Sequence, residues 1–137
     1  MIRALLDINV ILDVLFAREK TGEQARAVWQ AHEDERFTGY ICAITPPTVF
    51  YVARKVFGKS QAFKVTSALA ETFEVCAVDK SVLQSAMKLD MLDFEDAIQS
   101  ASALAAGLDF VVTSNLRDFK NSPVEALSPT EFLEQLK

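Results

Sequence analysis

The pattern of apolar and polar residues between positions 92 and 118 predicts a helix, a strand and a polar loop in succession. Six apolar residues follow the i, i+3, i+4 spacing of a helix with one buried face: Phe94, Ala97, Ile98, Ala101, Leu104 and Ala105. Gly107 follows where helices commonly end. The short apolar run Phe110–Val112 then stops at Thr113 and Asn115, which is typical of a buried strand in a parallel sheet.

The same alternation continues along the whole chain. We expect strands at residues 2–6, 40–44, 73–78, 110–112 and 124–127. Between them, the periodicity and the end signals predict six or seven helices, and the last begins with a capping box at Ser128–Glu131. Alternating strands and helices predict an α/β fold, a three-layer α/β/α sandwich around a central, mainly parallel sheet of about five strands. The length of 137 residues predicts that 1–137 form a single domain.

Composition narrows the class of protein. Half of the residues are apolar and 24% are charged, as in ordinary soluble globular proteins. No apolar run approaches the roughly 18 residues of a membrane span, and the first residues lack the features of a signal peptide, so we expect a cytoplasmic protein without membrane contact. The net charge of −5 argues against a protein that coats nucleic acid through its overall field, but it allows a local basic strip.

The residues that most often bind zinc or form disulfides give little signal here. Cys42 and Cys76 lie in apolar runs without a CxxC motif, and we expect both to be free buried thiols. His32 is the only histidine, and its position favours a residue at the surface or the C-terminal end of a predicted helix over a metal ligand.

Three aspartates occur where a parallel sheet would bring them together. Asp7 directly follows the first strand, Asp96 lies in the first turn of a helix, and Asp118 lies in the loop after the fourth strand. The carboxyl ends of parallel strands meet at one edge of the sheet, where ligands commonly bind. Carboxylates without histidine or cysteine suit hard cations such as Mg²⁺ or Mn²⁺, which can activate water for attack on a phosphodiester.

Each acid also has a structural interpretation. Asp93 suits a helix N-cap, Asp96 suits the first turn of the same helix, and Asp118 suits an Asx-type turn. Asp7 is harder to explain in this way, because a carboxylate directly after a buried strand needs partners. We expect Asp13 to face the opposite way on the first helix and to be exposed.

The densest positive region contains Arg54 and Lys55, followed by Lys59 and Lys64. These residues either form a solvated helical face or contact a phosphate backbone.

Three segments of this chain resemble the main motifs of the PIN domain family: Leu6–Val14, Asp93–Ala105 and Val111–Phe119. The similarity extends over essentially the whole chain and includes the segment Phe50–Lys55. The resemblance implies a Mg²⁺- or Mn²⁺-dependent endoribonuclease, which in small bacterial members is often the toxin of a toxin–antitoxin pair and a homodimer inhibited by its antitoxin.

The resemblance also implies roles for particular residues. By it, the metal ligands and catalytic residues would be Asp7, Asp96 and Asp118. Asn9, Thr113 and Asn115 would be supporting polar residues. Residues that would contact RNA are Arg54, Lys55 and Arg117.

One departure from the family pattern leaves alternatives open. Most active members have a second acid, usually glutamate, early in the helix after the second strand, where this chain reads Thr45-Pro46-Pro47-Thr48-Val49. The chain is therefore either a nuclease with three acids or a catalytically impaired PIN-like binding module. A third hypothesis is a phosphatase of the haloacid-dehalogenase type, with Asp7 as nucleophile, but Asn9 replaces that family's second aspartate.

Overall fold

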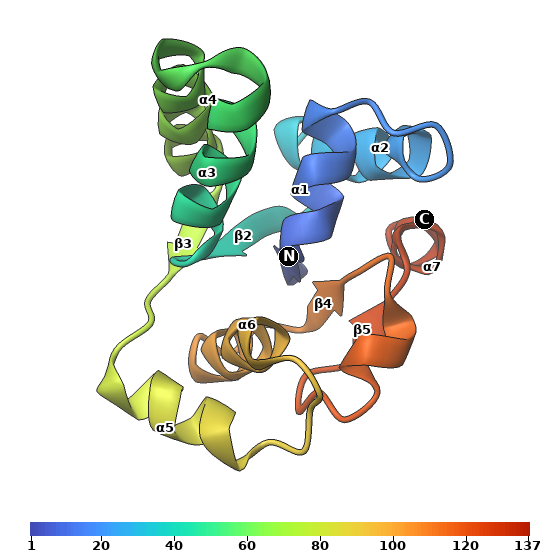
Figure 1. Cartoon of the computed structure of the whole chain (residues 1–137). Coiled ribbons are helices and arrows are strands. Elements are labelled where there is room, and N and C mark those ends of the chain that lie inside the picture. Colours follow the sequence, from blue (N-terminus) through green and yellow to red (C-terminus); the bar gives the residue numbers. More distant parts are fainter.

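A sheet of five parallel strands, in the order β3-β2-β1-β4-β5, lies at the centre of the fold (Figure 1). The computed structural model describes residues 1–137. The strands are β1 (Arg3–Leu6), β2 (Thr38–Cys42), β3 (Glu74–Cys76), β4 (Phe110–Val112) and β5 (Ala126–Leu127). The parallel α/β fold predicted from the sequence is confirmed, with strand ends that differ from the prediction by a few residues.

Helices cover both faces of this sheet (Figure 1). One face packs against α1 (Ile8–Leu15), α2 (Gly22–Glu33), α3 (Thr45–Phe57), α4 (Lys59–Thr72) and α7 (Pro129–Gln135). The other packs against α5 (Lys80–Lys88), α6 (Phe94–Ala105) and the short 3₁₀ helix η1 (Leu116–Phe119). None of the helices combines the length and the apolar character that crossing a membrane requires.

Alternation along the central strand explains the two layers. Ala4 and Leu6 point into the core beneath α1 and α2, whereas Leu5 points into the core beneath α6, and all three are fully buried. Successive side chains of a strand point to opposite faces, so a strand covered on both sides is apolar throughout.

The order of the strands places a crevice at the end of β1. The chain continues from β1 to β2 and β3 on one side, then returns to β4 and β5 on the other. Strand order therefore reverses at β1, and in open parallel sheets the crevice at such a point is the usual place for a ligand.

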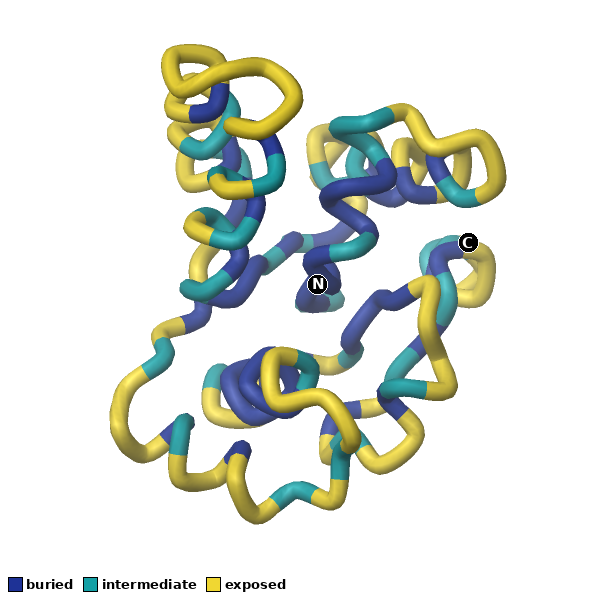
Figure 2. The backbone as a smooth tube through the Cα atoms, viewed as in Figure 1, coloured by how far each residue is buried: buried dark blue, intermediate teal, exposed yellow.

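The helices α3 and α4 form a hairpin that extends away from the sheet. Gly58, at φ 85°, joins them in a conformation that favours glycine. The far end of this hairpin is mostly exposed in Figure 2, and Arg54 and Lys55 lie there, in the last turn of α3.

His32 and the two cysteines have structural positions, as expected. The Nδ1 atom of His32 accepts a hydrogen bond from the Gly39 backbone N–H at 2.9 Å, so Nε2 carries the proton and donates to the Thr72 carbonyl at 2.6 Å. His32 thus links α2 to β2 and to the end of α4. Cys42 and Cys76 are free, buried thiols on neighbouring strands.

Candidate active site

Asp7 is the central residue of the candidate site because it is buried where β1 meets α1. Its side chain is 1% exposed, and its backbone N–H donates to the Val112 carbonyl of β4 at 2.9 Å. The hydroxyl of Thr113 donates to Oδ2 of Asp7 at 2.9 Å, and the Asn115 backbone N–H donates to that hydroxyl oxygen at 3.0 Å. Two segments more than 100 residues apart thus meet at this carboxylate.

Gln99 is the second partner of Asp7, and sequence analysis did not identify it. Its amide nitrogen donates to Oδ1 of Asp7 at 3.0 Å and lies 3.4 Å from Oδ1 of Asp96. The side chain is 1% exposed. The available signal is its spacing: Gln99 lies three residues after Asp96 and therefore on the same side of α6.

A cleft of about 230 Å³ opens beside Asp7 at the carboxyl end of the sheet. Its lining is mostly polar and comes from α1, α3, α6 and η1: Asp7, Ile8, Asn9, Leu12, Thr48, Asp93, Glu95, Asp96, Gln99 and Asp118. Five of these residues carry carboxyl groups and none is basic. The fold therefore gathers Asp7, Asp96 and Asp118 around one space, together with Asn9.

The electrostatics of the cleft are those of crowded acids without a counter-charge. Burial, together with the negative charges of Asp7, Asp93, Asp118 and Glu95, raises the pKa of Asp96 to about 7. Burial also raises the pKa of Asp7, although hydrogen bonds from Gln99, Thr113 and two backbone N–H groups oppose this effect. No basic side chain forms an ion pair with any acid of the cleft, because the ion pairs of the chain are Arg18–Asp13 and Lys137–Glu134.

Some residues named in the sequence analysis lie elsewhere. Asn115 is exposed and reaches the site only through its backbone N–H. Arg117 lines a neighbouring hollow of about 190 Å³ that shares Asp118 with the cleft. Arg54 and Lys55 lie six and seven residues beyond Thr48 on α3, which is roughly 10 Å along the helix axis from the cleft.

Asp93 is the N-cap of α6, as expected. Its carboxylate accepts a hydrogen bond from the Asp96 backbone N–H at 3.0 Å. The cap fixes the first turn of α6 and so holds the Asp96 side chain in the cleft wall.

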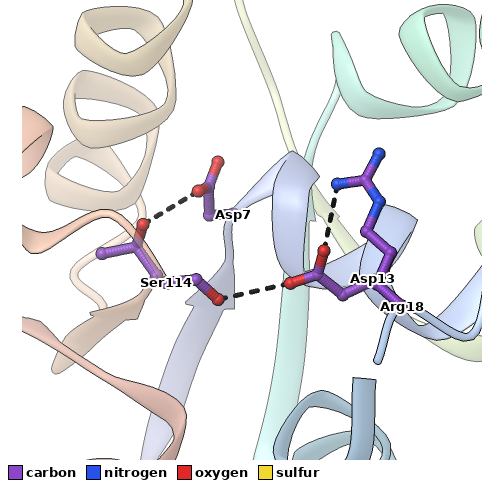
Figure 3. Close-up of polar contacts among 5 residues, drawn as sticks. Asp7, Asp13, Arg18 and Ser114 are labelled. Carbon is purple, nitrogen blue, oxygen red and sulfur yellow. Dashed lines mark hydrogen bonds and ion pairs between the residues drawn. The ribbon is translucent and has the colours of Figure 1, made fainter. Parts of the chain in front are cut away.

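The expectation that Asp13 is exposed is wrong. Asp13 is 3% exposed, and it accepts hydrogen bonds from Arg18 at 3.0 Å and from the Ser114 hydroxyl at 3.3 Å (Figure 3). Five of the eight residues of α1 are buried, so the helix has little solvent-facing surface on which a polar residue could lie. Ser114 comes from the loop after β4, a contact that no local pattern reveals.

Comparison with known proteins identifies the family to which this fold belongs. A sequence model of the PIN domain matches residues 3–117. The chain belongs to the PIN domain family. A search of curated protein sequences gave no significant match.

Solved structures with the same fold include chains of toxin–antitoxin complexes. A chain of the DNA-bound VapBC structure from Salmonella typhimurium superposes with a TM-score of 0.74 at 20% identity, covering 94% of this chain and 99% of that one. A toxin–antitoxin complex from Klebsiella pneumoniae gives a TM-score of 0.67 at 25% identity, covering 92% and 97%. The Mycobacterium tuberculosis toxin VapC20, described as cleaving the sarcin-ricin loop, gives a TM-score of 0.64 at 13% identity, covering 79% and 86%.

PIN domains are typically nucleases that use divalent metal ions, and the donor set of this cleft fits such an ion. No three acidic, histidine or cysteine side chains converge closely enough to enclose an ion directly. All the charged groups that line the cleft are nonetheless carboxylates, and burial together with their uncompensated charge raises the pKa of Asp96. Mg²⁺ keeps several of its waters and binds proteins through one or two carboxylates, which is the kind of site that this cleft offers.

Thr48 of this PIN domain lies near the start of α3, in the segment Thr45–Val49 that carries no carboxylate. It lines the cleft, and its hydroxyl donates to the Ile44 carbonyl at 2.8 Å, within its own helix. Helix α3 therefore contributes no negative charge to the site.

Proposed function

We propose that this PIN domain is a Mg²⁺- or Mn²⁺-dependent endoribonuclease that hydrolyses RNA phosphodiester bonds, and that residues 1–137 are its single domain. The observation that carries the proposal is the cleft at the end of β1, where five carboxyl groups meet without a basic side chain. Repulsion among these carboxylates lowers the stability of the folded protein. A cation from solution is the simplest counter-charge that would remove this repulsion.

The roles follow from the positions of the side chains. We assign Asp7, Asp96 and Asp118 to the metal and to catalysis, because these three acids come from three different segments that line one space. A bound divalent ion would lower the pKa of a water molecule and stabilise charge on the phosphate that it attacks. Thr113 and Gln99 orient the Asp7 carboxylate.

The remaining polar residues are proposed to contact the RNA or to stabilise the loop after β4. Asn9 lines the cleft at the start of α1, where its side chain can hydrogen-bond water or phosphate. Asn115 fixes Thr113 through its backbone N–H. Arg117 lies beside Asp118 and would contact an RNA phosphate that leaves the cleft, whereas Arg54 and Lys55 would contact RNA only at the far end of α3.

We further propose that the protein is a cytoplasmic, homodimeric toxin controlled by a cognate antitoxin. The support is the fold that it shares with chains of VapBC and other toxin–antitoxin structures over more than nine tenths of its length.

Cleavage of RNA by the purified protein tests the enzymatic proposal. We expect cleavage with Mn²⁺ or Mg²⁺ that EDTA abolishes and that returns when the metal is restored in excess. Cleavage that continues in EDTA after removal of contaminating nucleases would refute the metal dependence.

A second candidate function rests on Thr48. Without a carboxylate from α3, the domain could bind RNA or a partner without turnover. RNA binding that saturates without cleavage, in the presence of bound Mn²⁺, would favour this binding module over the nuclease.

A further inference from the structure

The side chain of Gln99 lies between two acids from distant parts of the chain. Its carbonyl oxygen accepts a hydrogen bond from the Ile8 backbone N–H at 3.1 Å. A backbone N–H can only donate, so the oxygen must face Ile8 and the amide nitrogen must face the acids. The orientation of the amide is therefore determined by its partners.

The amide nitrogen has two hydrogens, and two carboxylates lie within its reach. Asp7 Oδ1 is 3.0 Å away and Asp96 Oδ1 is 3.4 Å away. No ion pair forms with either acid, so this neutral group is the donor that the two carboxylates have in common. Its hydrogen bonds reduce repulsion between the acids without adding charge.

The contacts of Asp7 leave it able to bind a ligand. Gln99 donates to one carboxylate oxygen and Thr113 donates to the other. Each oxygen has a second lone pair, and Asp7 lines the cleft beside Asp96. The carboxylate is thus hydrogen-bonded on both oxygens while Asp7 lines the cleft.

We propose that Gln99 is a positioning residue that holds Asp7 and Asp96 in the orientation in which both carboxylates face one divalent cation. This inference rests on the proposed metal-dependent function. It adds that Gln99 sets the affinity of the cleft for the ion through its hydrogen bonds to the two acids.

Nuclear magnetic resonance of the metal-free protein tests the contact itself. The side-chain amide of Gln99 gives two proton resonances, which can be assigned by their loss in Gln99→Met. We expect Asp96→Asn to shift these resonances, whereas Ser100→Ala should leave them in place. Ser100 is a matched control because it is the next residue of α6 and equally buried, and its hydroxyl has no hydrogen-bond partner.

Titration with Mg²⁺, which is diamagnetic, tests the role in metal binding. We expect the Gln99 side-chain resonances to move saturably, with the dissociation constant that calorimetry gives for the wild type. Gln99→Met keeps a similar length but has no donor, and we expect about tenfold weaker Mg²⁺ binding, the usual effect of losing a group that orients a ligand. Ser100→Ala should bind Mg²⁺ as the wild type does.

Three results would overturn the inference, and they are distinguishable. If the chemical shifts of the Gln99 side-chain amide change neither in Asp96→Asn nor with saturating Mg²⁺, the positioning role is refuted. This result is decisive even if Gln99→Met does not fold. A folded Gln99→Met protein with wild-type affinity would refute it while the proposed function stands. No Mg²⁺ or Mn²⁺ binding by the wild type would refute the proposed function and, with it, the positioning of ligands for a metal.

Discussion

Two buried aspartates near the ends of α1 are compensated in opposite ways. Asp13, at 3% exposure, accepts hydrogen bonds from Arg18 and Ser114 (Figure 3), so the chain itself supplies a positive charge. Asp7, at 1% exposure, has only neutral donors, among them the side chains of Gln99 and Thr113, and further acids line the same cleft.

The difference separates a structural acid from a candidate catalytic one. Burial of a carboxylate is costly unless it is paired, and both residues are equally buried. The Asp13 pair satisfies this requirement within the chain. The Asp7 cleft does not satisfy it, and burial together with the crowded negative charges raises the pKa of Asp96 to about 7. Perturbed acids in a cleft without an internal counter-charge are a common mark of a functional site.

Exchange of each aspartate for asparagine should give the largest contrast. We expect Asp7→Asn to lower metal-dependent RNA cleavage by at least about 100-fold, since it removes a negative charge that would hold the divalent ion. Asparagine can still accept from Gln99 through its carbonyl oxygen and can donate to the Thr113 hydroxyl through its amide, so the fold should survive. In contrast, the Asp13→Asn protein should cleave RNA at a rate within about threefold of the wild-type rate, when both rates are expressed per folded molecule. Equal losses in both variants would contradict the distinction.

The ion pair of Asp13 should contribute measurably to stability. We expect Arg18→Ala to lower the free energy of unfolding by about 1 to 3 kcal/mol, because it leaves a buried carboxylate unpaired, although Arg18 is itself partly exposed. Urea denaturation measures this change. The control is Lys137→Ala, since Lys137 forms the other, exposed ion pair with Glu134 and should change stability by less than about 0.5 kcal/mol. An Arg18→Ala protein as stable as the control would mean that Asp13 does not depend on its counter-charge.

A carboxylate at position 48 should increase the negative charge of the cleft and its affinity for a divalent cation. We expect Thr48→Glu to tighten Mn²⁺ binding by about tenfold, because ligand charge is a main determinant of cation affinity. Thr66→Glu is a close control: Thr66 also donates to the carbonyl four residues earlier at 2.8 Å, but it lies on α4, outside the cleft lining. Calorimetry compares the two variants, and an equal gain in both would show that general negative charge is responsible.

The smallest expected effect is the pH dependence that Asp96 confers on the metal-free protein. Its pKa is about 7 when folded and near 3.8 when unfolded, so the folded state binds more protons between these values. The free energy of unfolding therefore falls as the pH rises from about 4 to 7. We expect Asp96→Asn to stabilise the protein by about 1 kcal/mol at pH 8, after allowance for solvent screening, and to give no gain at pH 3.5. An equal gain at both pH values would assign the effect to packing.

The sequence predicted the parts of this structure that local patterns encode. Asp7 and Asp118 follow apolar strands, and parallel strands bring such residues to one edge of the sheet. Asp93 was predicted as an N-cap because its residue type and position are those of a cap, and the hydrogen bond to the Asp96 N–H agrees. The strand order, which places β1 between β2 and β4, depends on crossover connections that the local pattern does not specify.

The residues that sequence analysis missed or misplaced depend on contacts between distant segments. Every residue of α6 from Ala97 to Ala103 is buried, so a polar residue there carries no clear directional signal, and Gln99 was overlooked. Asp13 was expected in solvent because it faces the opposite way from Asp7 on the first helix, but five of the eight residues of α1 are buried. Its partner Ser114 lies 101 residues away, a contact that only the folded sheet creates.

Calorimetric titration of Mn²⁺ into the wild type and Asp7→Asn is the most direct test of the central claim, that this cleft takes its counter-charge from solution. Measurement at pH 6.5 in two buffers of different ionisation enthalpy also detects protons that the acids release on binding. The account predicts saturable binding with proton release in the wild type, and loss of binding in Asp7→Asn. Absence of heat at millimolar Mn²⁺ in the wild type, or equal binding by Asp7→Asn, would contradict it.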